Sequence, residues 1–280
     1  MSEPPVLRVE AVRKSFGGVQ AVAGVSMALA RGEIRALIGP NGAGKSTLFN
    51  ILTGQLRADA GAIEFRGRAI TGLASHAIAR AGVARTFQIT ATFGSLTVLE
   101  NVQVARLSHV RASARLWRSA APLERDRAAE LLAHVGLTDQ ATRPAGVLAY
   151  GDLKKLELAI ALAGEPTLLL LDEPTAGMAP AERGSLMALT AALARERGLT
   201  VLFTEHDMDV VFAVADRAGG DAHQAHDRLQ GGRLARPVPS EQRDHFALAR
   251  RQRDAVQDVA EPVHGVDTAQ LEHQGSSSPR

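Results

Sequence analysis

Residues 39–47 have the residue types and spacing of a phosphate-binding loop. They read Gly-Pro-Asn-Gly-Ala-Gly-Lys-Ser-Thr and fit the pattern G-x-x-x-x-G-K-[ST]. The glycines leave room for backbone N–H groups to point at a phosphate chain, Lys45 supplies a positive charge for the β- and γ-phosphates, and the Ser46 hydroxyl suits Mg²⁺. The residues predicted to hold the phosphates are Gly39, Pro40, Asn41, Gly42, Ala43, Gly44, Lys45, Ser46 and Thr47.

The flanks of this loop support that interpretation. Residues 34–38 form a short apolar run, typical of a buried strand, and residues 48–52 have apolar positions at helical spacing. A strand, loop and helix in this order is the context that the pattern requires. The start of the helix adds partial positive charge beside the phosphates. We therefore reject the alternative of a chance glycine-rich turn.

Two acidic residues follow the most apolar run in the chain. Residues 167–171 are Thr-Leu-Leu-Leu-Leu, and Asp172 and Glu173 come next. Continuous apolarity is typical of a strand buried on both faces of a parallel sheet, and ligands bind beyond the carboxyl ends of such strands. Asp172 is placed to assist Mg²⁺, and Glu173 could polarise a water molecule for attack on the γ-phosphate. The alternative is a pair of acids that merely end a strand.

Two further polar residues follow predicted strands. His206 comes soon after the apolar residues 200–204 and could hydrogen-bond a γ-phosphate or an attacking water. Gln88 ends the strand predicted over residues 83–88, where its amide could touch a metal-bound water or sense a phosphate. Both have ordinary alternatives, since a histidine at a strand end is commonly structural and most glutamines are solvated.

An aromatic residue and a helix start complete the candidate residues. Phe16 lies in a turn-like stretch after the strand predicted at residues 7–10, and it either stacks on a purine ring or belongs to the core. Tyr150, Gly151 and Asp152 precede a helix predicted from Leu153, and a helix start is ready to bind an anion. In isolation these three residues would be an ordinary helix cap.

The composition excludes several classes of protein. The 280 residues carry a net charge of +2 and no cysteine, so disulfides, thiolate zinc sites and cysteine nucleophiles are excluded. No apolar run approaches the ~18 residues of a membrane span, and we expect no secretory signal at the start. The balanced charge predicts no nucleic-acid partner. Trp117 lies among arginines, which favours a solvated helix face over a nucleic-acid or lipid contact.

The order of these features resembles the ATP-binding subunits of ATP-binding-cassette (ABC) transporters. The order is Phe16, the phosphate loop, Gln88, a helical insert, residues 150–152, the acid pair and His206. Within that superfamily the chain looks most like the ATPase subunits of branched-chain amino acid importers. The stretches that carry the closer resemblance are Ala-Arg-Thr-Phe-Gln (84–88), Leu-Ala-Tyr-Gly-Asp (148–152), Asp-Glu-Pro-Thr-Ala-Gly-Met (172–178) and Thr-Glu-His-Asp-Met (204–208).

The resemblance implies an α/β fold, with a P-loop core sheet, an antiparallel β subdomain and a helical subdomain at about 89–155, all within an ATPase domain spanning 6–217. It implies that Phe16 stacks on adenine, that Ser46, Gln88 and Asp172 serve Mg²⁺, and that Glu173 is the catalytic base or positions the water. Lys45, Gln88 and His206 would complete the catalytic set, and Tyr150, Gly151 and Asp152 would close over ATP held by another subunit.

The implied partners are a second ATP-binding subunit, transmembrane permease subunits and, indirectly, a periplasmic or extracellular solute-binding protein. The implied place is the cytoplasmic face of the membrane, as a peripheral protein. The alternatives are an ABC protein that acts on another macromolecule and a regulator that binds ATP without hydrolysing it. Ala149 favours the regulator, because it stands where the family has a serine that bonds the γ-phosphate.

The C-terminal segment departs most from the family. Residues 218–280 contain no isoleucine, one phenylalanine and five of the nine histidines, a composition that buries little apolar surface. Either the reading frame changes near Ala218, or the segment is a disordered regulatory tail. His223 and His226 with Asp221 could suggest a metal site, but their spacing alone is weak support.

Overall fold

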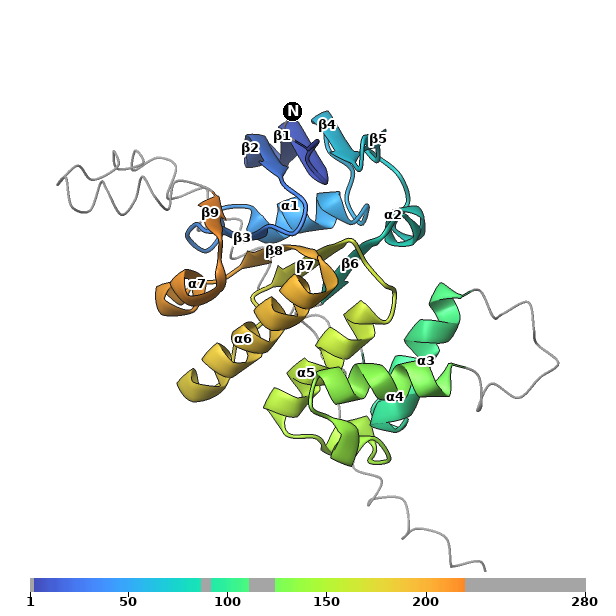
Figure 1. Cartoon of the computed structure of the whole chain (residues 1–280). Helices are drawn as coiled ribbons and strands as arrows, with labels where there is room; N and C mark the ends of the chain where they lie inside the picture. Colours follow the sequence, from blue (N-terminus) through green and yellow to red (C-terminus); the bar gives the residue numbers. More distant parts are fainter. Residues whose placement is uncertain (1–2, 87–91, 111–123, 220–280) are drawn as a thin grey trace, which may run out of the picture. The chain divides into compact units, whose positions relative to one another are not determined.

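The computed structural model describes residues 3–86, 92–110 and 124–219, which form two β-sheets with helices around them (Figure 1). One sheet is antiparallel with the strand order β2-β1-β4-β5, and the other is parallel with the order β6-β7-β8-β3-β9. The predicted α/β fold, with its core sheet, antiparallel part and helical insert, is confirmed.

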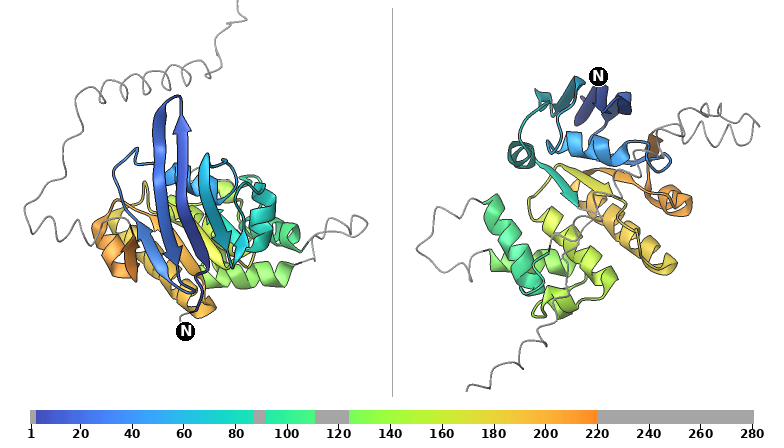
Figure 2. Two further views of the ribbon diagram at one scale, coloured as in Figure 1. Left: turned by 90° about the horizontal axis from the view of Figure 1, so that it is seen from above. Right: turned by 180° about the vertical axis from the view of Figure 1, so that it is seen from behind.

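The antiparallel sheet is built around one long hairpin. Strand β1 (Leu7–Phe16) and strand β2 (Val19–Leu29) pair along their length and turn at Gly17 and Gly18. Both turn glycines have positive φ, 50° and 85°, the conformation that tight hairpin turns require. Strand β4 (Ala60–Phe65) pairs with the other side of β1, and β5 (Arg68–Ala69) pairs with β4. Figure 2 shows the hairpin in blue, from above.

The parallel sheet carries the predicted site at its carboxyl edge. Its strands are β3 (Ile34–Leu37), β6 (Val83–Thr86), β7 (Leu168–Asp172), β8 (Thr200–Thr204) and β9 (Arg217–Gly219). Every residue of β7 and β8 is buried, as the continuous apolar run predicts. Strand β9 pairs with β3 and so continues two residues past the predicted end of the ATPase domain at 217.

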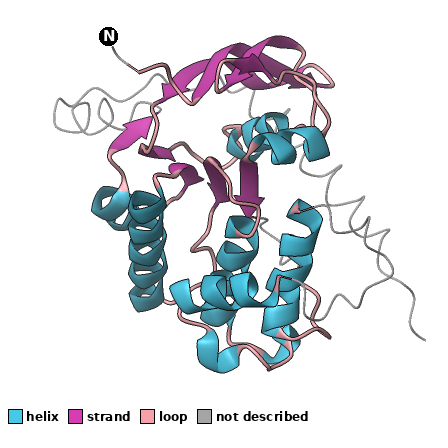
Figure 3. Ribbon diagram, turned by 45° about the vertical axis from the view of Figure 1, so that its right-hand side comes forward, coloured by secondary structure: helices cyan, strands magenta, loops and turns pink. Residues whose placement is uncertain are grey.

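The two faces of the parallel sheet pack into two separate cores. Leu168 and Leu170 of β7 pack with helix α1 (Lys45–Leu52) and the antiparallel sheet, whereas Leu169 and Leu171 pack with the helices on the other face. This division follows from the strand geometry, in which successive side chains point to opposite faces. Each fully buried leucine contributes roughly 1.5–3 kcal/mol. Figure 3 shows α1 between the two sheets.

Among the described residues, five other helices cover the second core. They are α3 (Val98–His109), α4 (Arg125–His134), α5 (Tyr150–Leu162), α6 (Pro180–Arg197) and α7 (Met208–Val214), with short 3₁₀ turns at Thr138–Gln140 and Ala145–Val147. Helix α2 (Ser75–Ala81) instead packs into the first core through Ile78. Helices α3, α4 and α5 pack on one another and form the predicted helical insert. Thr97 and Glu100 make a capping box at the start of α3.

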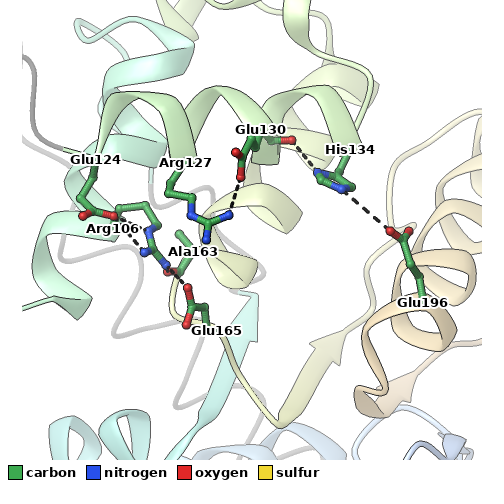
Figure 4. Close-up of polar contacts among 8 residues, drawn as sticks. All are labelled: Arg106, Glu124, Arg127, Glu130, His134, Ala163, Glu165 and Glu196. Atoms are coloured by element: carbon green, nitrogen blue, oxygen red, sulfur yellow. Dashed lines mark hydrogen bonds and ion pairs between the residues drawn. The ribbon is translucent and has the colours of Figure 1, made fainter.

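A buried arginine ties this insert to the segment before β7. The Arg106 side chain in α3 is 7% exposed; it donates to Glu124 at 2.9 and 3.1 Å, to Glu165 at 2.7 Å and to the Ala163 carbonyl at 3.0 Å (Figure 4). A second contact joins His134 of α4 to Glu196 of α6 at 4.0 Å. The helical insert is therefore fixed to the core by polar contacts as well as apolar packing.

Among the helices that the structure describes, none is both long and apolar enough to cross a membrane. Gln88, Trp117 and the segment after Gly219, including the histidines at 223 and 226, lie outside the described residues.

Candidate active site

The phosphate loop runs from the end of β3 into the first turn of α1, as predicted. Gly44 is the N-cap of α1 with φ of 83°, and no side chain caps the helix start. A Cβ atom on Gly44 would overlap the backbone carbonyl oxygen of Ala21 in β2. Glycine is therefore needed at position 44 for two reasons, the left-handed backbone and this close approach to β2. The uncapped N–H groups of α1 are suited to hold a phosphate.

Lys45 is held by the loop itself. Lys45 is 8% exposed, and its Nζ donates to the carbonyl oxygens of Gly39 at 2.7 Å and Pro40 at 3.0 Å. The Lys45 side chain thus links the end of the loop to its beginning. A cavity of about 380 Å³ lies beside it, lined by residues 20–25 of β2, Leu37, Ile38, Leu48 and residues 42–45. The charge of Lys45 and the N–H groups of the loop therefore border a space between β2 and α1.

Ser46 and Asp172 meet at the carboxyl edge of the sheet. The Ser46 hydroxyl lies 3.5 Å from Asp172 Oδ1, and the Thr204 hydroxyl donates to the same oxygen at 2.9 Å. Asp172 Oδ2 accepts from Arg85 Nη2 at 2.9 Å. A hydroxyl and a carboxylate are the hard oxygen donors that Mg²⁺ prefers, so Ser46 and Asp172 fit this metal. Gln88, the third predicted metal residue, lies outside the described part.

Glu173 and His206 are in direct contact. His206 Nε2 lies 2.8 Å from Glu173 Oε1. Glu173 has a positive φ of 48°, and its N–H lies within bonding distance of the Thr204 hydroxyl and carbonyl oxygens. A glutamate in the left-handed region is strained, and such strain gathers at functional sites. The side chains are 23% and 43% exposed, so the pair is open to a water molecule.

Phe16 lies at the end of β1 and is 48% exposed. Its ring is therefore outside the core, and the core alternative is wrong. Lys14 Nζ lies 5.5 Å from the ring centroid and also binds Asp59 at 2.6 Å. The exposed ring leaves a face for stacking, and this role stays a prediction.

Helix α5 begins three residues earlier than predicted. Ala149 is its N-cap, so Tyr150, Gly151 and Asp152 form the first turn and do not precede the helix. The reason is local: Ala149 is extended, with ψ of 151°, and Leu153 N–H already bonds the Ala149 carbonyl.

This turn is bound to the loop after β7. The Tyr150 hydroxyl donates to the Ala176 carbonyl at 2.9 Å, and Asp152 accepts from Lys155 at 2.9 Å. Within the described residues, no hydrogen bond joins residues 150–152 to residues 39–47. The structure therefore brings Lys45, Ser46, Asp172, Glu173 and His206 to one edge of the sheet and leaves residues 150–152 apart from the phosphate loop.

Two site residues were missed by the sequence reasoning. Arg85 was noted only as part of a motif, and Glu205 as a neighbour of His206. Glu205 is 4% exposed; it accepts from the Thr175 N–H at 3.0 Å and hydroxyl at 2.6 Å, and from the His206 N–H at 3.3 Å. A charged residue directly after a largely apolar strand, Thr-Val-Leu-Phe-Thr (200–204), was the signal available for Glu205, because such residues are buried only with partners.

A phosphate loop beside an acid-ended strand of a parallel sheet is the arrangement of P-loop nucleoside triphosphatases. A sequence model of the ABC transporter family matches residues 22–176. The high-affinity branched-chain amino acid transport ATP-binding protein BraF of Pseudomonas aeruginosa is 42% identical over 219 residues, which cover 76% of this chain and 86% of that protein. The chain belongs to the ABC transporter family, and the resemblance seen in the sequence is confirmed.

Solved structures agree with this family. The ADP conformation of MJ1267, an ATP-binding cassette of an ABC transporter, is 33% identical with a TM-score of 0.68, and the match covers 76% of this chain and 86% of that one. A dimeric post-hydrolysis state of the ATP-binding cassette MJ0796, bound to ADP and Pi, is 25% identical with a TM-score of 0.65, over 74% of this chain and 91% of that one. The family and these structures support nucleotide binding by this chain.

Proposed function

We propose that this chain is the ATP-binding and ATP-hydrolysing subunit of an importer for branched-chain or related amino acids. ATP hydrolysis is supported by the contact between Glu173 and His206 at 2.8 Å. Glu173 directly follows Asp172 in the chain. The solute class rests on similarity to BraF, whose name gives branched-chain amino acid transport. The Glu173–His206 contact favours this function over a regulator that binds ATP without hydrolysis.

The residues of the phosphate loop bind and orient the nucleotide. The N–H groups at the start of α1 and the Lys45 ammonium neutralise phosphate charge, and the exposed ring of Phe16 stacks on the adenine. The Ser46 hydroxyl and the Asp172 carboxylate, with Gln88 as the third predicted ligand, would hold Mg²⁺, which would supply further positive charge for the phosphates. Catalysis by this set is positioning together with charge stabilisation.

The residues beyond β7 and β8 act on the water. In this proposal, the Glu173 carboxylate accepts a hydrogen bond from a water molecule and orients the water oxygen toward the γ-phosphate. In this proposal, His206 holds the Glu173 carboxylate through its Nε2 and hydrogen-bonds the γ-phosphate or the attacking water. Glu205 holds the backbone on which His206 lies, through its bonds to Thr175 and to the His206 N–H.

A second ATP-binding subunit completes the site in this proposal. Tyr150 is bonded to the Ala176 carbonyl in the loop after β7 of its own chain. Among the described residues, no hydrogen bond joins residues 150–152 to residues 39–47, which supports their closing over ATP held by a partner. The dimeric structure of MJ0796 with ADP and Pi supports the presence of a second subunit. The permease subunits, the solute-binding protein and the cytoplasmic membrane face follow from the importer assignment.

Phosphate release from ATP tests the proposal. The purified chain, alone and with its membrane subunits, should release phosphate in the presence of Mg²⁺, and Glu173→Gln should abolish the release. Equal turnover by the variant and the wild type would refute the role of Glu173. Adjacent permease and solute-binding protein genes would support import.

The boundaries stay part of the proposal: an ATPase domain at 6–217, with its helical subdomain at about 89–155, and an atypical tail from 218. A changed reading frame near Ala218 is tested by translating the other two frames of the gene. An apolar strand followed by a glycine turn in one of them would support it, and their absence from both would leave the regulatory tail.

A further inference from the structure

Arg85 is a buried arginine at the carboxyl edge of the parallel sheet, and its role in the proposed site is unassigned. It lies near the end of β6, and its side chain is 8% exposed. We propose that Arg85 is a positioning residue for Asp172, which sets how well the site binds Mg²⁺ together with ATP. This inference rests on the proposed function, because it concerns the same nucleotide site.

The two carboxylate oxygens of Asp172 have different partners. Oδ2 accepts from Arg85 Nη2 at 2.9 Å, whereas Oδ1 lies 2.9 Å from the Thr204 hydroxyl and 3.5 Å from the Ser46 hydroxyl. A carboxylate bonded at both oxygens is held against rotation. Arg85 therefore keeps Oδ1 directed at Ser46, where the two oxygen donors that fit Mg²⁺ converge.

Arg85 is itself anchored to the helix that follows the phosphate loop. Its Nη1 donates to Asn50 Oδ1 at 2.6 Å and to Gln55 Oε1 at 3.3 Å, and its guanidinium lies 5.7 Å from the centroid of the Phe49 ring. Asn50 lies one turn after Ser46 in α1. Arg85 thus bridges the helix that carries Ser46 and the strand that carries Asp172.

The planar guanidinium is suited to this bridge. Its two terminal nitrogens bond different partners at fixed angles, whereas a lysine ammonium is a single point on a flexible stem. Partners that orient metal ligands in this way commonly change metal affinity by about 10–100-fold when they are removed.

The positive charge of Arg85 alone would have the opposite effect on Mg²⁺ binding. A cation beside Asp172 weakens the attraction of that carboxylate for Mg²⁺, so removing the cation alone would strengthen metal binding. However, the Asp172 side chain is 1% exposed, and without Arg85 its Oδ2 would lose a charged donor in a buried place. We therefore expect that losing the position of Asp172 weakens Mg²⁺ binding more than removing the neighbouring positive charge strengthens it. Whether Mg²⁺ binding weakens or strengthens without Arg85 decides between the two effects.

The test measures binding of a non-hydrolysable ATP analogue by full-length protein as Mg²⁺ is titrated, and also in EDTA. Arg85→Met should raise the Mg²⁺ concentration at the midpoint about tenfold and leave binding in EDTA unchanged. Arg85→Lys, which keeps the charge, should show a smaller rise. Should Arg85→Met fail to fold, Asn50→Ala carries the test, because it removes an anchor of Arg85 and should raise the midpoint a few-fold.

Arg35→Met is the matched control. Arg35 lies in the same sheet, in β3, and its buried ion pair with Glu33 is 2.6 Å long. Its loss should lower the melting temperature and leave the midpoint unchanged. An unchanged or lowered midpoint in folded Arg85→Met, or an equal rise in Arg35→Met, would overturn the positioning role. Wild-type protein that binds the analogue with no response to Mg²⁺ would refute the proposed metal site itself.

Discussion

Replacing Arg106 with methionine should destabilise the chain and leave its nucleotide site intact. Arg106 joins α3 to Glu124, just before α4, and to Ala163 and Glu165, just before β7 (Figure 4). Methionine keeps much of the apolar stem and removes every one of these bonds. The described contacts of Arg106 include none of the residues of the candidate active site, so binding of an ATP analogue should be retained.

The expected loss can be worked out from exposure. Glu124 is 26% exposed and loses two charged hydrogen bonds, a change worth about 1.5–3 kcal/mol. Glu165 is 62% exposed and is rehydrated, so its pair adds less than about 1 kcal/mol. We expect the free energy of unfolding to fall by about 1.5–4 kcal/mol in total.

The loss should also depend on pH. The hydrogen bond from Arg106 holds the pKa of Glu165 below its ordinary value of 4.5. A carboxylate with a lowered pKa adds stability above its unfolded pKa, and this stability is lost as the pH falls through the folded pKa. The difference in the free energy of unfolding between wild type and Arg106→Met should therefore be constant from neutral pH down to about pH 4.5 and become smaller below that pH.

Denaturant unfolding followed by circular dichroism measures this loss. The matched control is Arg127→Gln, because Arg127 and Glu130 form an exposed pair, with 66% and 55% of their side chains exposed, and this variant should lose much less stability than Arg106→Met. Equal losses in Arg106→Met and Arg127→Gln would refute the reasoning, as would a loss in Arg106→Met that does not change with pH.

Two further substitutions test residues at the site itself. Gly44→Ala should abolish binding of an ATP analogue, because Gly44 has a φ of 83° and no room for a Cβ. The control Gly198→Ala, at a φ of 63° with open space around it, should lose only about 1–2 kcal/mol of stability and keep binding. Equal losses of binding in the two variants, measured by calorimetry, would contradict this. Glu205→Gln should lower the free energy of unfolding by about 1–3 kcal/mol, because its bonds to Thr175 and His206 change. The same change should slow phosphate release, and turnover equal to that of the wild type would contradict this role of Glu205 at the site.

Local patterns were sufficient to predict much of the site. The phosphate loop is recognisable because its pattern and its strand–loop–helix context lie within about twenty residues. Asp172 was predicted at a strand end because a run buried on both faces implies a parallel sheet, whose strands end at one edge. Glu173 and His206 come from separate strands, and their contact follows from the pairing of β7 with β8.

Other features depend on contacts between distant parts of the chain. Arg85 reaches Asp172 across 87 positions in sequence, and a single arginine in a short strand gives no sign of that partner. Glu205 pairs with Thr175 across 30 positions. The start of α5 was placed too late because the pattern there has no serine, threonine, aspartate or asparagine at the N-cap, and Ala149 caps the helix by backbone conformation alone.

The C-terminal boundary shows how strand pairing decides where a sheet ends. Residues 217–219 have a composition that does not predict a strand, yet they pair with β3 in register, Arg35 with Arg217 and Leu37 with Gly219. Asp216 begins this pairing, since its N–H bonds the Ile34 carbonyl at 2.8 Å and its carboxylate accepts from the Ile34 N–H at 2.9 Å.

The most direct test of the central claim is the mass of the Glu173→Gln protein in solution with ATP and Mg²⁺. If Glu173 orients the water and residues 150–152 close over ATP held by another subunit, the variant should bind ATP without turnover. Light scattering after size exclusion should then show a stable dimer, absent in EDTA. A variant that stays monomeric with ATP bound, or that hydrolyses ATP at the wild-type rate, would contradict the account.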